Sequence, residues 1–131
     1  MASIFTKIIN REIPAYIVAE DEKFISFLDN NPLAIGHTLV IPKREEDYIF
    51  DLSDAELAEL VVFSKRVAKA IQSVIHCKRI GISVFGLEVP HVHVHLVPLN
   101  LTGDINFAKP KLVLSKDEFI SVTQKIKSAF K

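Results

Sequence analysis

Several features that identify large classes of proteins are missing from this chain of 131 residues. It has a single cysteine, Cys77, so no intramolecular disulfide can form. Sixteen basic residues balance sixteen acidic ones, without the basic excess typical of nucleic-acid-binding proteins. No apolar run approaches the roughly 20 residues of a membrane span. The segment from Met1 to Lys7 lacks the features of a secretory signal, so we expect a cytoplasmic protein with neither nucleic-acid nor membrane partners.

Linkers, low-complexity tracts and internal repeats are missing as well, which predicts one domain over residues 1–131. The fold class we expect is α+β, with an antiparallel sheet of about five strands packed against one long helix. A short N-terminal helix and a C-terminal helix complete it. The expected strands are Ala15–Ala19, Phe24–Leu28, Gly36–Pro42, Arg79–Phe85 and His91–Val97.

The helices are predicted from capping residues and apolar spacing. Ser53 and Glu56 match a capping box, and apolar residues at helical spacing follow them as far as Ile75. Ser115 and Glu118 repeat the pattern and begin the C-terminal helix. The short N-terminal helix covers residues 4–9.

The most informative segment is His91-Val-His93-Val-His95-Leu-Val. Alternate residues of a strand share a face, so the three imidazoles would project from one side. The other face, directed into the core, would carry Val92, Val94 and Leu96. A solvated strand face that happens to carry histidines is the simplest interpretation, but nothing structural requires three in register.

Two functional interpretations compete for this cluster. Alternating histidines on a strand are a familiar way to hold zinc, and a catalytic zinc ion usually takes three protein ligands plus water. Further ligands and supporting carboxylates would have to come from distant loops. The other interpretation is covalent catalysis on phosphorus, in which a neutral imidazole attacks and its neighbours stabilise the developing charge without a metal. Three crowded imidazoles would repel each other's protons and keep the central ring neutral.

The segment resembles the signature of the histidine triad (HIT) family, His-φ-His-φ-His-φ-φ, where φ is apolar. The resemblance extends over most of the chain. Within the family, the chain is most similar to the branch of nucleoside phosphoramidate and dinucleotide polyphosphate hydrolases. The matching pieces, in the same order and spacing, are Ser3–Ile9, Ile13-Pro14, Glu20–Glu22, Phe27–Asp29 and Gly36–Lys43.

The resemblance implies a catalytic group of four histidines. His93 would attack the α-phosphorus and form a covalent nucleotidyl-histidine, which water would then hydrolyse to a nucleoside monophosphate. The backbone carbonyl of His91 would hold the other ring nitrogen of His93. His95 would contact phosphate oxygens, and His37 would be an additional pocket histidine. No cofactor and no metal ion are implied.

The resemblance also implies a nucleotide pocket and a homodimer. Asp29 would bind ribose hydroxyls, although it could simply shape its turn. The base pocket would be lined by Ile4, Phe5, Ile8 and Phe27, and purines would be favoured because apolar walls reward their larger area. Three of these, Phe5, Ile8 and Phe27, could instead be plain core, and His37 could be an ordinary surface histidine.

The chain departs from the family pattern in three regions. Some relatives bind structural zinc through a Cys-x-x-Cys pair, but those positions are Ser3 and Thr6, so we expect no zinc there. The segment after Pro42, which often carries a histidine, reads Lys43–Glu45.

The third departure precedes the triad, where Gly86–Pro90 replaces a longer Gly-rich loop and Glu88 stands in place of a Ser or Thr hydroxyl. A carboxylate there would repel an anionic phosphate, accept from an amine leaving group, or orient a histidine. The altered loop leaves a rival hypothesis, a nucleotide-binding regulatory module with little turnover.

Overall fold

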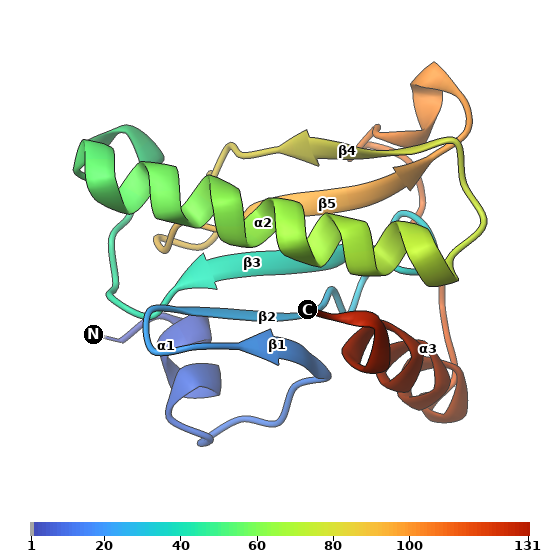
Figure 1. Cartoon of the computed structure of the whole chain (residues 1–131), viewed down its shortest axis with the longest axis horizontal. Coiled ribbons are helices and arrows are strands. Elements are labelled where there is room, and N and C mark those ends of the chain that lie inside the picture. Colours follow the sequence, from blue (N-terminus) through green and yellow to red (C-terminus); the bar gives the residue numbers. More distant parts are fainter. Residues whose placement is uncertain (1) are drawn as a thin grey trace.

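The computed structural model describes residues 2–131, and Met1, the first residue of the predicted domain, lies outside them. Five strands form one sheet in the order β1-β2-β3-β5-β4, and every neighbouring pair is antiparallel (Figure 1). The predicted α+β class and strand number are therefore confirmed. The strands are β1 (Ile17–Glu20), β2 (Phe24–Leu28), β3 (Thr38–Pro42), β4 (Arg79–Ser83) and β5 (Val94–Leu99).

Three α-helices surround the sheet, and two of them begin at the predicted capping residues. Ser53 accepts a hydrogen bond from the backbone N–H of Glu56, and Ser115 does the same for Glu118. Among the described residues, no helix combines the length and apolar character needed to cross a membrane. The helices are α1 (Ile4–Ile9), α2 (Asp54–Val74) and α3 (Lys116–Ala129), with short 3-10 turns at η1 (Ile49–Asp51) and η2 (Thr102–Asp104).

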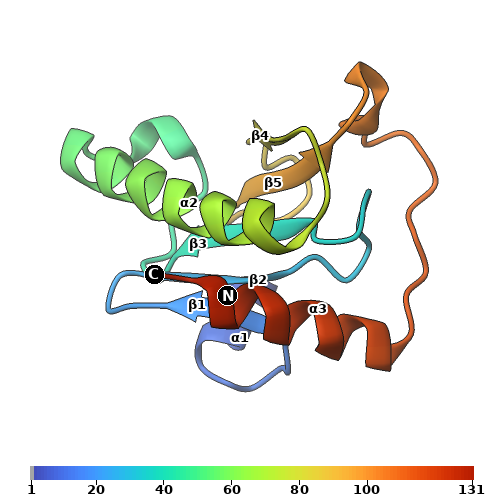
Figure 2. The ribbon, with the colours of Figure 1, turned by 45° about the vertical axis from the view of Figure 1, so that its right-hand side comes forward.

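The two faces of the sheet carry different helices. α2 and α3 lie against one face, where they bury the main hydrophobic core, and α1 lies against the other (Figure 2). Because both faces are covered at the centre, every residue of β2 and β3 is buried. The smaller core on the α1 face consists of Phe5, Ile8, Ile25, Phe27, Leu39 and Ile41.

The predicted strand His91–Val97 differs from the observed β5 at both ends and in its burial, since β5 runs from Val94 to Leu99. β5 begins only at Val94, because the backbone N–H of Val92 donates to the carbonyl of Glu46 instead of joining the ladder. The three imidazoles still lie on one side, and Val92, Val94 and Leu96 lie in the core as predicted. The alternative interpretation, a solvated strand face, is wrong, since the histidines are buried.

Smaller differences affect three other strands. β4 ends at Ser83 instead of Phe85, and β1 begins two residues later and ends one residue later than the first predicted strand. β3 begins at Thr38, because Gly36 has a φ of 94° and so cannot continue an extended strand.

Candidate active site

The three histidines of the motif gather on the sheet face that α1 covers. His91 and His93 lie in the segment that leads into β5, and His95 is the second residue of β5. Their exposed fractions are 0%, 6% and 6%, so all three are held in fixed surroundings. Phe5 of α1 packs edge-on against His93, with ring centroids 5.0 Å apart.

The ring of His93 is oriented by the backbone. Its Nδ1 donates to the carbonyl oxygen of His91 at 2.7 Å, since a carbonyl can only accept. In the neutral ring the lone pair then belongs to Nε2. His93 also lines a cavity on this face of the sheet, so Nε2 is the nitrogen available to a ligand there.

A chain of hydrogen bonds sets the proton positions of His37 and His95. The backbone N–H of Leu33 donates to Nδ1 of His37 at 3.0 Å, so the proton of the neutral His37 ring is on Nε2. This Nε2 lies 3.0 Å from Nδ1 of His95, which must accept. The remaining proton of His95 is therefore on Nε2, a buried atom without a hydrogen-bond partner among the described residues. An unpaired buried donor beside a cavity is suited to an anionic ligand.

Burial keeps the rings of His37 and His95 neutral. It lowers the pKa of His37 to about 4 and that of His95 to about 3, because the charged forms lose their hydration. Two aromatic rings enclose His95: Phe85 stacks on it at 5.2 Å between centroids, and Phe107 meets it edge-on at 4.7 Å. The proposition that His37 is an ordinary surface histidine is wrong, since it is 1% exposed.

The Asp29 carboxylate shapes its turn and also faces His37. One carboxylate oxygen accepts from the backbone N–H of Asn31 at 2.8 Å, which shapes the turn after β2. The other lies 3.5 Å from Nε2 of His37. Burial raises the pKa of the Asp29 carboxyl. Asp29 also lines the cavity, so its side chain remains accessible to a ligand.

A cavity of about 250 Å³ joins most of the residues singled out from the sequence. Its lining combines an apolar wall with a polar end. The wall contains Ile4, Phe5, Ile8 and Phe27, and the polar end contains Asp29, Glu88, His93 and His95. His91 and His37 do not line it and lie behind His93 and His95, respectively.

A smaller adjoining cavity of about 190 Å³ contains residues that the sequence did not single out. Lys111 lines it beside Asp29 and His93, and its ammonium group donates to the carbonyls of Phe107 and Lys109. Phe85 and Phe107 line it too. Residues 105–114 have no apolar periodicity that would place them at a site. The charge of Lys111 is the one feature of this segment that could have indicated a role in ligand binding.

One group of ligand atoms is close enough to consider a metal ion. Potential ligand atoms of Asp29, His37 and His95 all lie within 4.8 Å of one another. Nε2 of His37 and Nδ1 of His95 are already joined by a hydrogen bond, so an ion between them would have to displace the proton of His37. This geometry favours the hydrogen-bonded arrangement.

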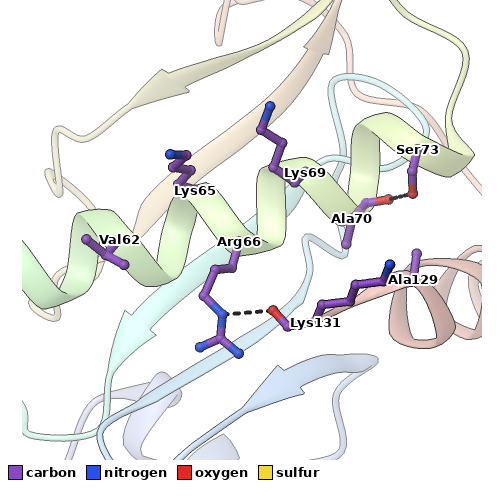
Figure 3. A pocket seen from close by; sticks show the side chains of 8 residues that line it. All are labelled: Val62, Lys65, Arg66, Lys69, Ala70, Ser73, Ala129 and Lys131. Carbon is purple, nitrogen blue, oxygen red and sulfur yellow. Dashed lines mark hydrogen bonds between the residues drawn. The ribbon is translucent and has the colours of Figure 1, made fainter.

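A larger cavity of about 630 Å³ lies on the other side of the sheet, between α2 and the end of α3 (Figure 3). Arg66 donates to the backbone carbonyl of Lys131 at 2.9 Å. The ammonium groups of Lys65 and Lys69 point away from Arg66, so the cations do not converge on one point (Figure 3). The lining contains no histidine, carboxylate or thiol, and the triad cavity is therefore the candidate active site.

Comparisons with known proteins agree with this geometry. The HIT domain family matches residues 10–101. The adenosine 5'-monophosphoramidase hnt1 of Schizosaccharomyces pombe is 32% identical and covers 100% of both chains. A HIT-like protein involved in cell-cycle regulation from Bartonella henselae superposes with a TM-score of 0.84 at 30% identity, over 98% of this chain and 96% of that one. A zinc-bound histidine triad protein from Mycobacterium smegmatis gives 0.80 at 28% identity, over 98% and 93%.

Proposed function

The chain belongs to the HIT domain family, and we propose that it hydrolyses a nucleoside phosphoramidate or dinucleotide polyphosphate at the α-phosphorus through His93. The observation that carries the proposal is the pair of oriented rings: Nδ1 of His93 is held by the carbonyl of His91, and His95 offers an unpaired Nε2–H. One ring is thus arranged to attack and the other to donate. The name of the S. pombe relative supports this class of reaction.

The reaction proceeds in two displacements. In the first, the Nε2 lone pair of His93 bonds to the α-phosphorus, and the bond to the leaving group breaks with its electrons. The leaving group takes a proton from solvent and departs as an amine, a phosphate or a nucleotide. In the second, the oxygen of a water molecule bonds to phosphorus, the electrons of the N–P bond return to Nε2, and the water releases a proton to solvent.

The cavity lining supports a purine nucleotide as substrate. Apolar side chains at one end suit a flat base, and an enclosed carboxylate, Asp29, suits ribose hydroxyls. The donor on His95 and the ammonium group of Lys111 suit phosphate oxygens at the other end. In this proposal the base packs against Phe5 and Phe27, and the phosphate contacts His95.

The decisive experiment is trapping of the covalent intermediate. We expect incubation with an adenosine phosphoramidate to give a nucleotidyl adduct by mass spectrometry. His93→Ala should abolish it and reduce turnover by about a thousandfold or more, with an unchanged circular dichroism spectrum. His76→Ala removes an exposed histidine and serves as the control. An adduct that persists in His93→Ala would contradict the assignment of the nucleophile.

The same experiment separates the enzyme from the regulatory alternative. A nucleotide-binding module would bind adenosine monophosphate in a calorimetric titration but give neither adduct nor product. Glu88, which lines both cavities, is the departure from the family pattern that favours such a module.

A further inference from the structure

The region where some relatives hold structural zinc has a different chemistry in this chain. Zinc in proteins is bound by cysteine thiolates, histidines and carboxylates. Here the two cysteine positions carry Ser3 and Thr6, whose hydroxyls are poor ligands, and the neighbouring groups are Glu45 and His91. Glu45 and His91 alone are too few, because a structural zinc ion takes about four such ligands, so these residues do not fit it.

Glu45 instead anchors the start of α1 by hydrogen bonds. Its Oε1 accepts from the backbone N–H of Ser3 at 2.7 Å and from the hydroxyl of Thr6 at 2.6 Å. These bonds lower the pKa of the Glu45 carboxyl to about 2, because they stabilise its charged form. The carboxylate is therefore charged at neutral pH, and its hydrogen bonds tie α1 to the segment that follows β3.

The proton positions around His91 follow from its partners. Nε2 lies 2.8 Å from the carbonyl oxygen of Pro42, which can only accept, so the ring proton is on Nε2. Nδ1 must then accept, and the hydroxyl of Ser3 donates to it at 2.8 Å. The hydroxyl oxygen of Ser3 accepts in turn from the backbone N–H of Thr6 at 3.0 Å. Both ring nitrogens of His91 are thus occupied, and the ring is 0% exposed.

We propose that Ser3, Thr6 and Glu45 form a metal-free clamp that fixes His91 and thereby positions His93 for attack. The clamp reaches His93 through a single residue. It holds the ring of His91, and the backbone carbonyl of the same His91 accepts from Nδ1 of His93 at 2.7 Å. If the His91 ring can move, this carbonyl and the His93 ring lose their fixed direction. Ser3, Thr6 and Glu45 are positioning residues, and none of them lines the cavity.

The proposal rests on the proposed function only for its kinetic consequence. Its structural part concerns hydrogen bonds of His91 and His93, which nuclear magnetic resonance detects whether or not the protein turns over a nucleotide. A failure of the reaction and a failure of the clamp are therefore distinguishable.

The first test is Ser3→Ala, with Ser115→Ala as its matched control. Each substitution removes the side-chain cap of a helix, but only Ser3 contacts His91. In Ser3→Ala we expect the ¹⁵N resonance of His91 Nδ1 to move to that of an unbonded nitrogen. The His93 Nδ1 proton should exchange with water about tenfold faster, and kcat for an adenosine phosphoramidate should fall about tenfold at a KM within about twofold. Unchanged resonances, or equal losses in Ser115→Ala, would overturn the clamp.

The second test compares Glu45→Gln with Glu45→Ala. Glutamine keeps an oxygen that accepts both bonds from α1 but loses the charge. We expect Glu45→Gln to stay within about threefold of the wild-type kcat, and Glu45→Ala to fall about tenfold as Ser3→Ala does. Equal losses in both variants would show that charge near His91, and not the hydrogen-bonded clamp, is what matters.

The third test concerns metal directly. Wild-type protein dialysed against EDTA should keep its turnover and its His91 resonances, and added zinc should change neither. The triple variant Ser3→Cys, Thr6→Cys, Glu45→His should bind one zinc ion per chain by atomic absorption, and EDTA should then alter its His91 resonances. Loss of wild-type His91 order on EDTA treatment, restored by zinc, would overturn the metal-free assignment.

Discussion

Three identical side chains in one short motif have different partners, and the partners decide what each ring can do. Carbonyl oxygens fix the proton of His91 on Nε2 and that of His93 on Nδ1. A neighbouring histidine fixes the proton of His95 on Nε2. Nε2 of His93, the proposed nucleophile, and Nε2 of His95, the proposed donor, thus have opposite protonation, which one shared environment would not provide.

The buried pair His37 and His95 should make stability depend on pH. Both rings are neutral in the folded state, with a pKa of about 4 and about 3, and both titrate near 6.5 when unfolded. The unfolded chain therefore binds more protons below pH 6.5, and the free energy of unfolding should fall as pH drops from 6.5 towards 4. Each ring contributes up to about 1.4 kcal/mol per pH unit.

Urea unfolding at several pH values measures this slope. His37→Gln should reduce it between pH 6.5 and 4, whereas His76→Gln, which replaces an exposed histidine, should leave it unchanged. Equal slopes in wild type and His37→Gln would refute the buried, neutral state of His37.

Glu88 should influence the choice of leaving group. Its carboxylate lines both cavities, where it would favour an amine and oppose a polyphosphate. We expect Glu88→Gln to lower kcat/KM for an adenosine phosphoramidate and raise it for a dinucleotide polyphosphate, each by about threefold to tenfold. Glu22→Gln, on the exposed turn between β1 and β2, is the control. Unchanged rates for both substrates would remove Glu88 from the mechanism.

The helices were predictable because their signals are local. A serine cap with a glutamate three residues later marks the start of both α2 and α3. The reciprocal capping box is complete at α3, whereas at α2 only the serine bond forms and the Glu56 carboxylate pairs with Arg44. The start of β5 was not predictable, since Val92 donates to Glu46, a residue far away in the sequence. The burial of the triad likewise depends on α1 and on Phe85 and Phe107, which local alternation cannot reveal.

The candidate site was predictable in part, through the family resemblance. That resemblance named the residues of the apolar wall and the four histidines, and the fold brings them together around one cavity or directly behind it. Lys111 escaped notice because it lies in an irregular segment without a repeating pattern. The position of Lys111 depends on the path of residues 105–114. That path is held by contacts with distant residues, such as the hydrogen bond from the backbone N–H of Leu112 to the carbonyl of Pro32.

The turn between β2 and β3 depends on one glycine. Gly36 has a φ of 94°, and a Cβ there would lie 3.0 Å from the Ile75 side chain. We expect Gly36→Ala to destabilise the protein by roughly 1–3 kcal/mol and to lower turnover, because His37 is the next residue. Gly103→Ala, where a Cβ meets nothing within 4 Å, is the control, and calorimetric melting compares the two. Equal melting temperatures would contradict the strain.

The family resemblance implies a homodimer, and one edge of the sheet offers a surface for a second copy. β4 is an edge strand, and its Ile82 is 57% exposed. We predict that sedimentation velocity gives about twice the 14.7 kDa of the chain. Ile82→Lys should shift the protein toward monomer, and Ile120→Lys, a substitution on α3, should not. A monomeric wild type would refute this prediction.

Asp29 directly follows β2 and His37 directly precedes β3, and the two residues are joined by a backbone hydrogen bond of 3.0 Å. These are the two strands enclosed on both faces. In many enzymes the reactive loops are among the first parts to open locally. Here, deuterium labelling of the resting protein should find some of its slowest amides beside the reacting groups, so a ligand would enter a site whose shape already exists instead of ordering one as it arrives.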